Sequence, residues 1–331
     1  QSINVLKNTP IIITFNEPIQ IKNHHNIRLK EFDTDIPINI TSTIIEETKL
    51  HIIANNNGMT SEMKYYVEIT ADAIQDKANN PNLYAGIQGV GLTKTEYEFT
   101  VIDYIPPVIN FLQGLNPLNL ASEVSPDTDI TIDFSENIII QNNNSIYLKK
   151  EIDDEIIPIV IPINIDNNTG NQVPTTRLTI NPNIYLPSKN KFYVQIDSDA
   201  ISDITGNYFT GLIKNDYSFT SQDYEAPEII RVIPSYNMVI DELEPKILIK
   251  FNENIKILNS NDNLNIINFN TNINHDTIPF SDSTKLVIQD SQLVIQNYIP
   301  FEYNKEYYIT FGNNIISDIS QSENIFAGIL D

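Results

Sequence analysis

The 331-residue sequence lacks cysteine and tryptophan, and it has few basic side chains, 20 lysines and arginines against 43 aspartates and glutamates. The absence of cysteine excludes disulfides, thiol catalysis and cysteine-based zinc sites. The net charge of −23 argues against a nucleic-acid partner, because the chain has too few cations to neutralise phosphates. No apolar run approaches the roughly 20 residues of a membrane-spanning helix, so we expect no direct membrane insertion.

Recognisable catalytic motifs are also missing. The four histidines are scattered, and none belongs to a His-Glu-x-x-His motif or lies near a serine nucleophile motif. Carboxylate pairs are frequent, but chance produces them in a chain this acidic, so they do not indicate a glycosidase-like pair. The sequence therefore predicts a protein that is not an enzyme.

The abundant residues favour strands and turns. The chain has 60 isoleucines and 44 asparagines. Isoleucine is β-branched and favours strands, whereas asparagine is depleted in strands and favours turns. Short stretches such as residues 130–134 alternate apolar and polar side chains, and no segment of helical length carries a clear apolar stripe. We therefore predict an all-β protein.

A nine-residue pattern occurs three times and indicates internal repeats. Residues 11–19, 130–138 and 247–255 each begin with apolar residues at alternate positions and continue as Phe-(Ser/Asn)-Glu-(Pro/Asn)-Ile. In each copy the positions between the apolar residues vary in character. This alternation is typical of a strand with one buried and one exposed face.

A second pattern follows later in each repeat. It begins with an aromatic-rich strand and ends at an aspartate in a turn, over residues 64–76, 191–203 and 306–318. A closing Tyr-x-Phe-Thr element at 97–100 and 217–220 comes shortly before a proline-marked joint. Proline and its restricted predecessor make such joints short and extended.

These repeats divide the chain into three domains, residues 1–103, 104–223 and 224–331. Each has the size of a β-sandwich, and three sandwiches in series predict an elongated rod. The first domain has an incomplete opening strand and the third lacks a closing strand, which we interpret as a sign that the sequence is an excerpt of a longer tandem array. The alternative is a neighbouring chain that donates the missing strand.

In their order and spacing, these motifs resemble bacterial Ig-like domains of the S-layer (SbsA) type. The second repeat matches best, since residues 203–207 look like the family's Asp-x-x-Gly-Asn turn. In the first repeat we expect Asn79 to take the left-handed position, and the third repeat departs further over residues 318–322. The resemblance implies tandem Ig-like β-sandwiches that are extracellular, exposed at the cell surface and non-catalytic. Such domains occur in S-layer proteins, adhesins, surface stalks and spacers beside enzyme domains, and fold alone does not decide among these roles.

Acidic residues recur at matching positions of the repeats: a glutamate at the end of the first strand, an aspartate in the later turn, and an aspartate before a joint. They are Glu17, Glu136, Glu253, Asp76, Asp203, Asp318, Asp103 and Asp223. Calcium prefers about six to eight oxygen ligands, which carboxylates and carbonyls in a cleft between domains can supply. We therefore predict Ca²⁺ sites that relieve repulsion within the acidic chain. In the alternative, each turn aspartate caps its own backbone and each glutamate binds a backbone group or a lysine.

We interpret the chain as a structural segment of a long extracellular surface protein, an S-layer, filament or stalk, that associates with copies of itself or of a related surface protein. The alternative is cell adhesion, in which an adhesin or a viral or phage fibre binds a host receptor or glycan. The candidate binding insertion, residues 151–171, is aliphatic and acidic rather than aromatic and so favours the structural role. Tyr66, Tyr193 and Tyr308 stand at matching positions, where we expect exposed rings with a shared structural role.

Overall fold

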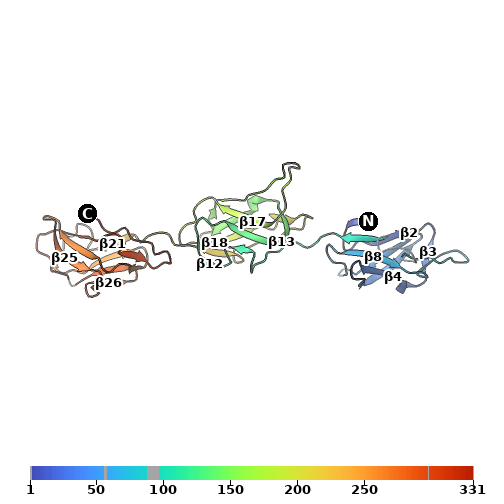
Figure 1. Cartoon of the computed structure of the whole chain (residues 1–331), viewed down its shortest axis with the longest axis horizontal. Helices are drawn as coiled ribbons and strands as arrows, with labels where there is room; N and C mark the ends of the chain where they lie inside the picture. Colours follow the sequence, from blue (N-terminus) through green and yellow to red (C-terminus); the bar gives the residue numbers. More distant parts are fainter. Residues whose placement is uncertain (1, 56–57, 88–96, 297, 331) are drawn as a thin grey trace.

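The structure, a computed structural model, describes residues 2–55, 58–87, 97–296 and 298–330. These residues form β-strands, turns and short 3-10 helices, and no α-helix occurs among them. Figure 1 shows the strands gathered into three bodies that follow one another in a row. The prediction of an all-β protein is therefore confirmed. In the described part of the chain, no helix is long and apolar enough to span a bilayer.

The first domain packs two strand layers around one core. One layer is a five-stranded sheet with the order β1-β10-β8-β4-β5, and the other consists of the groups β2-β7-β6 and β3-β9. β1 runs parallel to β10, whereas β8 runs antiparallel to both of its neighbours. The elements are β1 (Ser2–Val5), β2 (Ile11–Thr14), β3 (Ile19–Ile21), η1 (His24–Asn26), β4 (Ile27–Glu31), β5 (Pro37–Ile38), β6 (Ile40–Glu46), β7 (Lys49–Ala54), β8 (Lys64–Ile69), β9 (Ile74–Asp76) and β10 (Glu98–Val101).

The second domain repeats this arrangement. Its sheets have the orders β12-β20-β18-β14-β15 and β11-β13-β17-β16, and β19 also pairs with β13. β12 runs parallel to β20, as β1 does to β10. The elements are β11 (Leu115–Asn116), β12 (Ala121–Val124), β13 (Ile130–Ile140), η3 (Asn143–Ser145), β14 (Ile146–Lys150), β15 (Ile156–Ile157), β16 (Ile159–Val160), β17 (Thr175–Pro182), β18 (Lys191–Ile196), β19 (Ile201–Asp203) and β20 (Ser218–Ser221).

The third domain has an open sheet edge in the described part of the chain. Its strand groups are β21-β22-β27-β26, β23-β29 and β25-β24-β28, so β28 has a partner strand on one side, whereas β8 and β18 have partners on both sides. All side chains of β28 are partly exposed, whereas β8 and β18 each bury four. The elements are β21 (Ile229–Ile233), β22 (Ile247–Phe251), β23 (Ile255–Ile257), β24 (Asn263–Asn268), β25 (Ile273–Pro279), β26 (Leu286–Gln289), β27 (Gln292–Ile295), β28 (Tyr307–Thr310) and β29 (Ile316–Asp318).

The alternating pattern builds the core of each domain. In β13 the side chain of Ile132 is fully buried and Phe134 is 6% exposed, whereas Asp133 between them is partly exposed. The rings of Phe134 and Phe209 meet edge to face, with centroids 5.3 Å apart, an arrangement that aromatic quadrupoles favour. The equivalent edge-to-face pairs are Phe15–Tyr84 in the first domain and Phe251–Phe326 in the third.

The matching tyrosines share a structural role, but the prediction that their rings are exposed is wrong for two of them. Tyr66 is 2% exposed and Tyr193 is 3% exposed, while Tyr308 is partly exposed. Each hydroxyl donates a hydrogen bond to the side chain of a turn residue whose φ is positive, so the ring holds a tight turn in place. The acceptors are Asp35 for Tyr66, Asp154 for Tyr193 and Asn272 for Tyr308.

Candidate metal centres at the domain joints

A turn after β19 presents a buried carboxylate at the edge of the second domain. Asp203 is 1% exposed; its Oδ1 accepts 2.8 Å hydrogen bonds from the backbone amides of Thr205 and Asn207. Its Oδ2 accepts a 2.7 Å hydrogen bond from the Asn207 side chain. Burial alone would raise the pKa of Asp203, but the hydrogen bonds outweigh it and hold the pKa below its usual range. The turn therefore keeps this aspartate ionised.

The same turn occurs in the other two domains with a longer loop. Asn82 donates backbone and side-chain hydrogen bonds to Asp76, and Asn324 does the same to Asp318. Each of these asparagines stands six residues after its aspartate, whereas the spacing in the second domain is four. The expectation for Asn79 is wrong, because its φ is not positive and the later asparagine makes the contact.

The first joint is held by Asp103, the residue at which the chain leaves the first domain. Its Oδ1 accepts hydrogen bonds from the Ser61 hydroxyl at 2.5 Å and from the Ile105 amide at 3.0 Å. Its backbone carbonyl accepts a 3.1 Å hydrogen bond from the Asn207 side chain across the joint. The amide group of Asn207 thereby connects Asp103 of one domain with Asp203 of the next.

The second joint repeats these contacts around Asp223. Its Oδ1 accepts hydrogen bonds from the Ser188 hydroxyl at 2.9 Å and from the Glu225 amide at 3.3 Å. Its carbonyl accepts a 3.2 Å hydrogen bond from the side chain of Asn324 in the third domain. The tyrosine that follows each joint aspartate also donates its hydroxyl to a carbonyl of the preceding domain, Tyr104 to Met59 and Tyr224 to Leu186.

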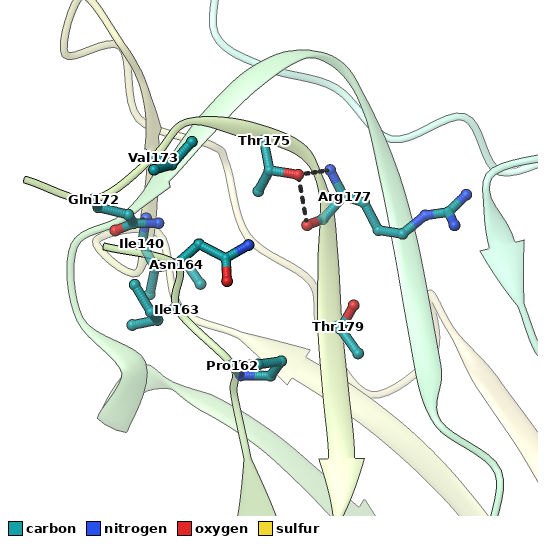
Figure 2. Close-up of a pocket in the computed structure, with 9 residues that line it drawn as sticks. All are labelled: Ile140, Pro162, Ile163, Asn164, Gln172, Val173, Thr175, Arg177 and Thr179. Carbon is teal, nitrogen blue, oxygen red and sulfur yellow. Dashed lines mark hydrogen bonds between the residues drawn. The ribbon is translucent and has the colours of Figure 1, made fainter. Parts of the chain in front are cut away.

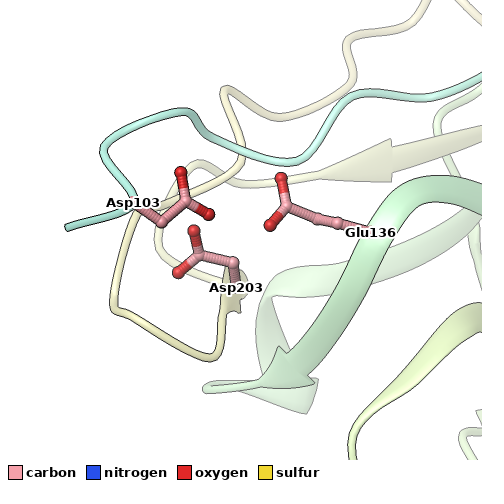
Figure 3. Close-up of side chains that lie close together, drawn as sticks. All are labelled: Asp103, Glu136 and Asp203. Atoms are coloured by element: carbon pink, nitrogen blue, oxygen red, sulfur yellow. The ribbon is translucent and has the colours of Figure 1, made fainter. Parts of the chain in front are cut away.

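Consecutive residues of the nine-residue pattern serve different parts of the joint. The phenylalanine packs in the core, and the next residue, Ser135, accepts a 3.1 Å hydrogen bond from the amide of Val108 in the incoming chain. In the third domain Asn252 accepts the corresponding bond from Glu228, at 2.9 Å. The glutamate that follows, Glu136 in the second domain, directs its carboxylate toward the joint (Figure 3).

Asp103, Glu136 and Asp203 form the first acidic cluster. One carboxylate oxygen of each residue lies within 4.8 Å of the others, and Figure 3 shows the three groups facing one another. Oxygens on opposite sides of a calcium ion are at most about 5 Å apart, because each lies about 2.3–2.6 Å from the ion. The spacing therefore fits a calcium-sized cation. Among the described residues, no lysine, arginine or histidine forms an ion pair with any of the three.

The electrostatics of this first cluster also favour a cation. Burial raises the pKa of Glu136 to about 7, and the negative charges of Asp103, Asp203 and Glu62 add to the effect. Such a shift arises when a carboxylate is poorly solvated and lies among like charges. A divalent cation bound to these oxygens would remove the repulsion and restore the ionised form.

Asp223, Glu253 and Asp318 form the second acidic cluster, again with one oxygen of each within 4.8 Å of the others. Here the protein itself supplies a cation. The Lys189 Nζ lies 2.6 Å from Asp223 Oδ2 and also forms an ion pair with Glu253. Lys189, Asp223 and Glu253 line a cleft of about 340 Å³ at the joint between the second and third domains.

The structure thus brings six of the eight predicted residues into two groups of three and leaves Glu17 and Asp76 outside them. Glu17 is exposed and Asp76 caps its own turn, and within the described ranges neither joins a group of three acidic residues. The alternatives to metal binding are also partly realised, because Asp203 caps its own backbone and Glu253 binds a lysine. That the groups bind a metal stays a prediction.

Sequence reasoning missed several residues of the joints. Each missed serine stands three residues before the first residue of an aromatic-rich strand. Each missed asparagine stands two residues before an aromatic residue, and the ring of that residue packs edge to face on the phenylalanine of the nine-residue pattern. These spacings recur and could have revealed the residues before the structure was known. The missed residues are Ser61, Ser188, Asn82, Asn324, Tyr104, Tyr224, Glu62 and Lys189.

A separate cavity of about 180 Å³ lies in the second domain (Figure 2). It is located where the long loop that joins β16 to β17, here called the excursion, begins and ends. Its one charged lining residue is Arg177, which donates hydrogen bonds of 2.6 and 2.8 Å to Asp133. The cavity therefore offers no unpaired charge among its lining residues. That lining consists of Ile140, Pro162, Ile163, Asn164, Gln172, Val173, Thr175, Arg177 and Thr179.

Three successive two-layered β-sandwiches define a tandem protein of immunoglobulin type. Residues 1–101, 103–221 and 223–329 each match the family described as bacterial Ig-like domain, and the chain belongs to that family. The predicted resemblance and the prediction of three tandem Ig-like domains are confirmed. Domains of this family are typically non-catalytic. A comparison with curated proteins finds no match.

The solved structures to which this chain is similar include bacterial and animal proteins. The N-terminal part of the bacterial S-layer protein SbsC is 13% identical with a TM-score of 0.23, over 66% of this chain and 43% of that one. The S-layer protein rSbsC(31-844) is 10% identical with a TM-score of 0.23, over 100% of this chain and 58% of that one. The FN1-FN3 domains of chicken CNTN1 are 11% identical with a TM-score of 0.30, over 98% and 93% of the two chains.

Proposed function

We propose that the chain is a non-catalytic structural segment of a bacterial cell-surface protein, in which Ig-like domains form a stiff rod and calcium stabilises the first joint. The observation that carries the proposal is that both joints are built from the same bonds. In each, a serine binds the carboxylate of the joint aspartate, and an asparagine of the next domain binds its carbonyl. Membership of the bacterial Ig-like family supports a surface location.

These repeated contacts favour a fixed relation between neighbouring domains over a free linker. The joint aspartate binds partners in the domain that it leaves and in the domain that it meets, so rotation about the joint would break hydrogen bonds on one side or the other. Each such bond contributes roughly 0.5–1.5 kcal/mol, and more where a carboxylate is involved. A rod with stiff joints suits an S-layer, filament or stalk.

Calcium would bind at the first acidic cluster. Asp103, Glu136 and Asp203 supply carboxylate oxygens from both sides of the joint, and water and backbone carbonyls would complete the six to eight ligands that calcium takes. Because one aspartate comes from the first domain and the other two residues from the second, an ion bound here would tie the domains together. It would also neutralise part of the net charge of −23 that opposes association between copies of the chain.

The test is to measure the distance between the first two domains with and without calcium. The chain has no cysteine, so Thr41→Cys and Thr176→Cys place spin labels on two exposed strand positions. We expect double electron–electron resonance to give a narrow distance distribution in millimolar calcium and a broader one after EDTA. Asp203→Asn is the matched variant, since it keeps the shape but removes a charge, and its distribution should stay broad in calcium. Identical distributions with calcium and EDTA in the unsubstituted labelled chain would refute calcium stabilisation of the joint.

Self-association is tested separately by sedimentation velocity and electron microscopy over a range of calcium concentrations. We expect end-to-end or lateral contacts between chains to increase with calcium, because the ion reduces like-charge repulsion. Isolated monomers at every calcium and protein concentration would contradict an assembly role. A rod that stiffens with calcium but never associates would instead identify the segment as a spacer.

One observation favours recognition as a second candidate function. The excursion between β16 and β17 exposes apolar side chains, with Ile165 51% and Val173 44% exposed. In Figure 1 this segment stands out from the body of the second domain. A variant that replaces residues 162–173 with a short turn should lose binding to cells or glycan arrays if the excursion recognises a receptor, and should keep its calcium-dependent stiffness.

A further inference from the structure

One position differs in charge between two joints that are otherwise built alike. Glu62 in the first domain and Lys189 in the second each follow the serine that binds the joint aspartate. Both have left-handed backbone conformations, with φ of 60° and 56°, and both are exposed. The two side chains therefore leave the same place in the fold, on the domain that precedes the joint.

At the second joint the lysine side chain occupies the acidic cluster. The Lys189 Nζ lies 2.6 Å from the Oδ2 of Asp223, a residue that is only 2% exposed, and it also pairs with Glu253 across the joint. Within the described ranges, that Oδ2 has no hydrogen-bond partner besides the lysine. Partial burial would lower the pKa of Lys189, but the two carboxylates outweigh it and raise the pKa. The ammonium is thus the cation of this cluster.

At the first joint the same position adds a negative charge. Glu62 is a carboxylate that repels the carboxylate of Glu136, so it adds negative charge at the position where Lys189 supplies a positive one. No cationic side chain among the described residues pairs with this cluster. At the second joint, the Lys189 ammonium lies between two carboxylates of the cluster, so a cluster of this geometry accommodates a cation.

We propose that the residue at this position determines which cation neutralises the acidic cluster at each joint. Lys189 supplies an ammonium group in place of a metal ion at the second joint, whereas Glu62 leaves the first joint dependent on a divalent cation from solution. The part that concerns the first joint rests on the proposed function above. An ammonium nitrogen and a calcium ion approach carboxylate oxygens at similar distances, so the two exclude each other. The chain should therefore bind one calcium ion at its joints and not two.

Calcium stoichiometry on the full chain tests this inference. Isothermal titration with Ca²⁺ alone should give one joint site in the wild type, two in Lys189→Glu, and none in Glu62→Lys. Lys305→Glu and Glu302→Lys change the net charge equally at exposed positions away from both clusters, and each should keep one site. Circular dichroism melts identify any variant that does not fold.

A second measurement does not depend on those charge reversals. Spin labels at Thr176→Cys and Ile273→Cys, both on exposed strand positions, report on the second joint. In the wild type, EDTA should leave this distance distribution unchanged, while Lys189→Gln should broaden it in the presence or absence of calcium. The same EDTA treatment should broaden the distribution across the first joint.

The outcomes separate the two proposals. Two calcium sites in the wild type, or an unchanged count in folded Lys189→Glu, would overturn the role of Lys189 and leave the first calcium site standing. No calcium binding by the wild type, together with one site in Lys189→Glu, would support the lysine replacement and refute calcium at the first joint. A second joint that broadens with EDTA would also overturn the inference.

Discussion

The side chain of Asn207 provides the sharpest test of how the domains are joined. Its Nδ2 donates 2.7 Å to Asp203 within the turn and 3.1 Å to the Asp103 carbonyl across the joint. A hydrogen bond to a charged group contributes about 1.5–3 kcal/mol, and one to a neutral carbonyl about 0.5–1.5 kcal/mol. Asn207→Ala should therefore cost about 2–4.5 kcal/mol in the local stability of the turn and joint.

The first domain supplies a matched control. Asn82 donates its side-chain amide to Asp76 at 2.8 Å, and in the described part of the chain it has no acceptor from another domain. Asn82→Ala should therefore cost only the turn component, about 1.5–3 kcal/mol. The difference between the two variants reports the interdomain bond together with the 3.0 Å contact between Asn207 Nδ2 and the Thr205 hydroxyl, about 1 kcal/mol or somewhat more.

Hydrogen exchange followed by mass spectrometry resolves these effects, because peptides from each turn report local opening free energies separately. Asn207→Ala should speed exchange in peptides that cover residues 103–107 as well as 203–209, whereas Asn82→Ala should affect only its own turn. Equal losses for both variants, with unchanged exchange at 103–107, would refute the reasoning that this amide holds the joint.

Three further predictions concern the stability of the second domain. Ile132→Ala should cost about 2–5 kcal/mol in urea unfolding because its side chain is fully buried, whereas Thr131→Ala on the exposed face of the same strand should stay within about 0.5 kcal/mol. Tyr193→Phe should cost about 1.5–3 kcal/mol by loss of its hydrogen bond to the Asp154 carboxylate, and Tyr185→Phe, at a residue 71% exposed, should have no measurable effect. Burial raises the pKa of Tyr217, so its stabilising contribution is complete below the unfolded pKa of about 10 and is lost as the pH rises above it. Unfolding free energies should therefore fall more steeply above pH 10 in the wild type than in Tyr217→Phe, and equal slopes would contradict this assignment.

Much of the architecture follows from local patterns in the sequence. The alternation around Ile132 requires one buried face, because a shift of one residue would place the polar set in the core. Three copies of this pattern at similar spacing then specify three similar cores. The acidic positions at the strand end, the turn and the joint were also identifiable, since each stands at a fixed place relative to these patterns.

Other features of the joints depended on chain segments that are far apart in sequence. Asp103 and Asn207 are 104 residues apart, and no local pattern states that a carbonyl of one meets the amide of the other. The burial of Tyr66 was mispredicted for the same reason, since the Phe32 ring that meets it edge to face comes from another segment of the chain. Loop length also hid Asn82, because a turn with two added residues presents the same amide from a different position in the sequence.

By itself, the sequence determined the all-β class, the threefold repeat and the acidic residue types at the joints, because strand periodicity and turn chemistry act over a few neighbouring residues. Only the tertiary structure decided which carboxylates meet, and that Lys189 lies among one set while Glu62 lies beside the other. The physical reason is that electrostatic interactions depend on distance in space. A joint between folded domains brings together charges whose separation in sequence carries no information about that distance.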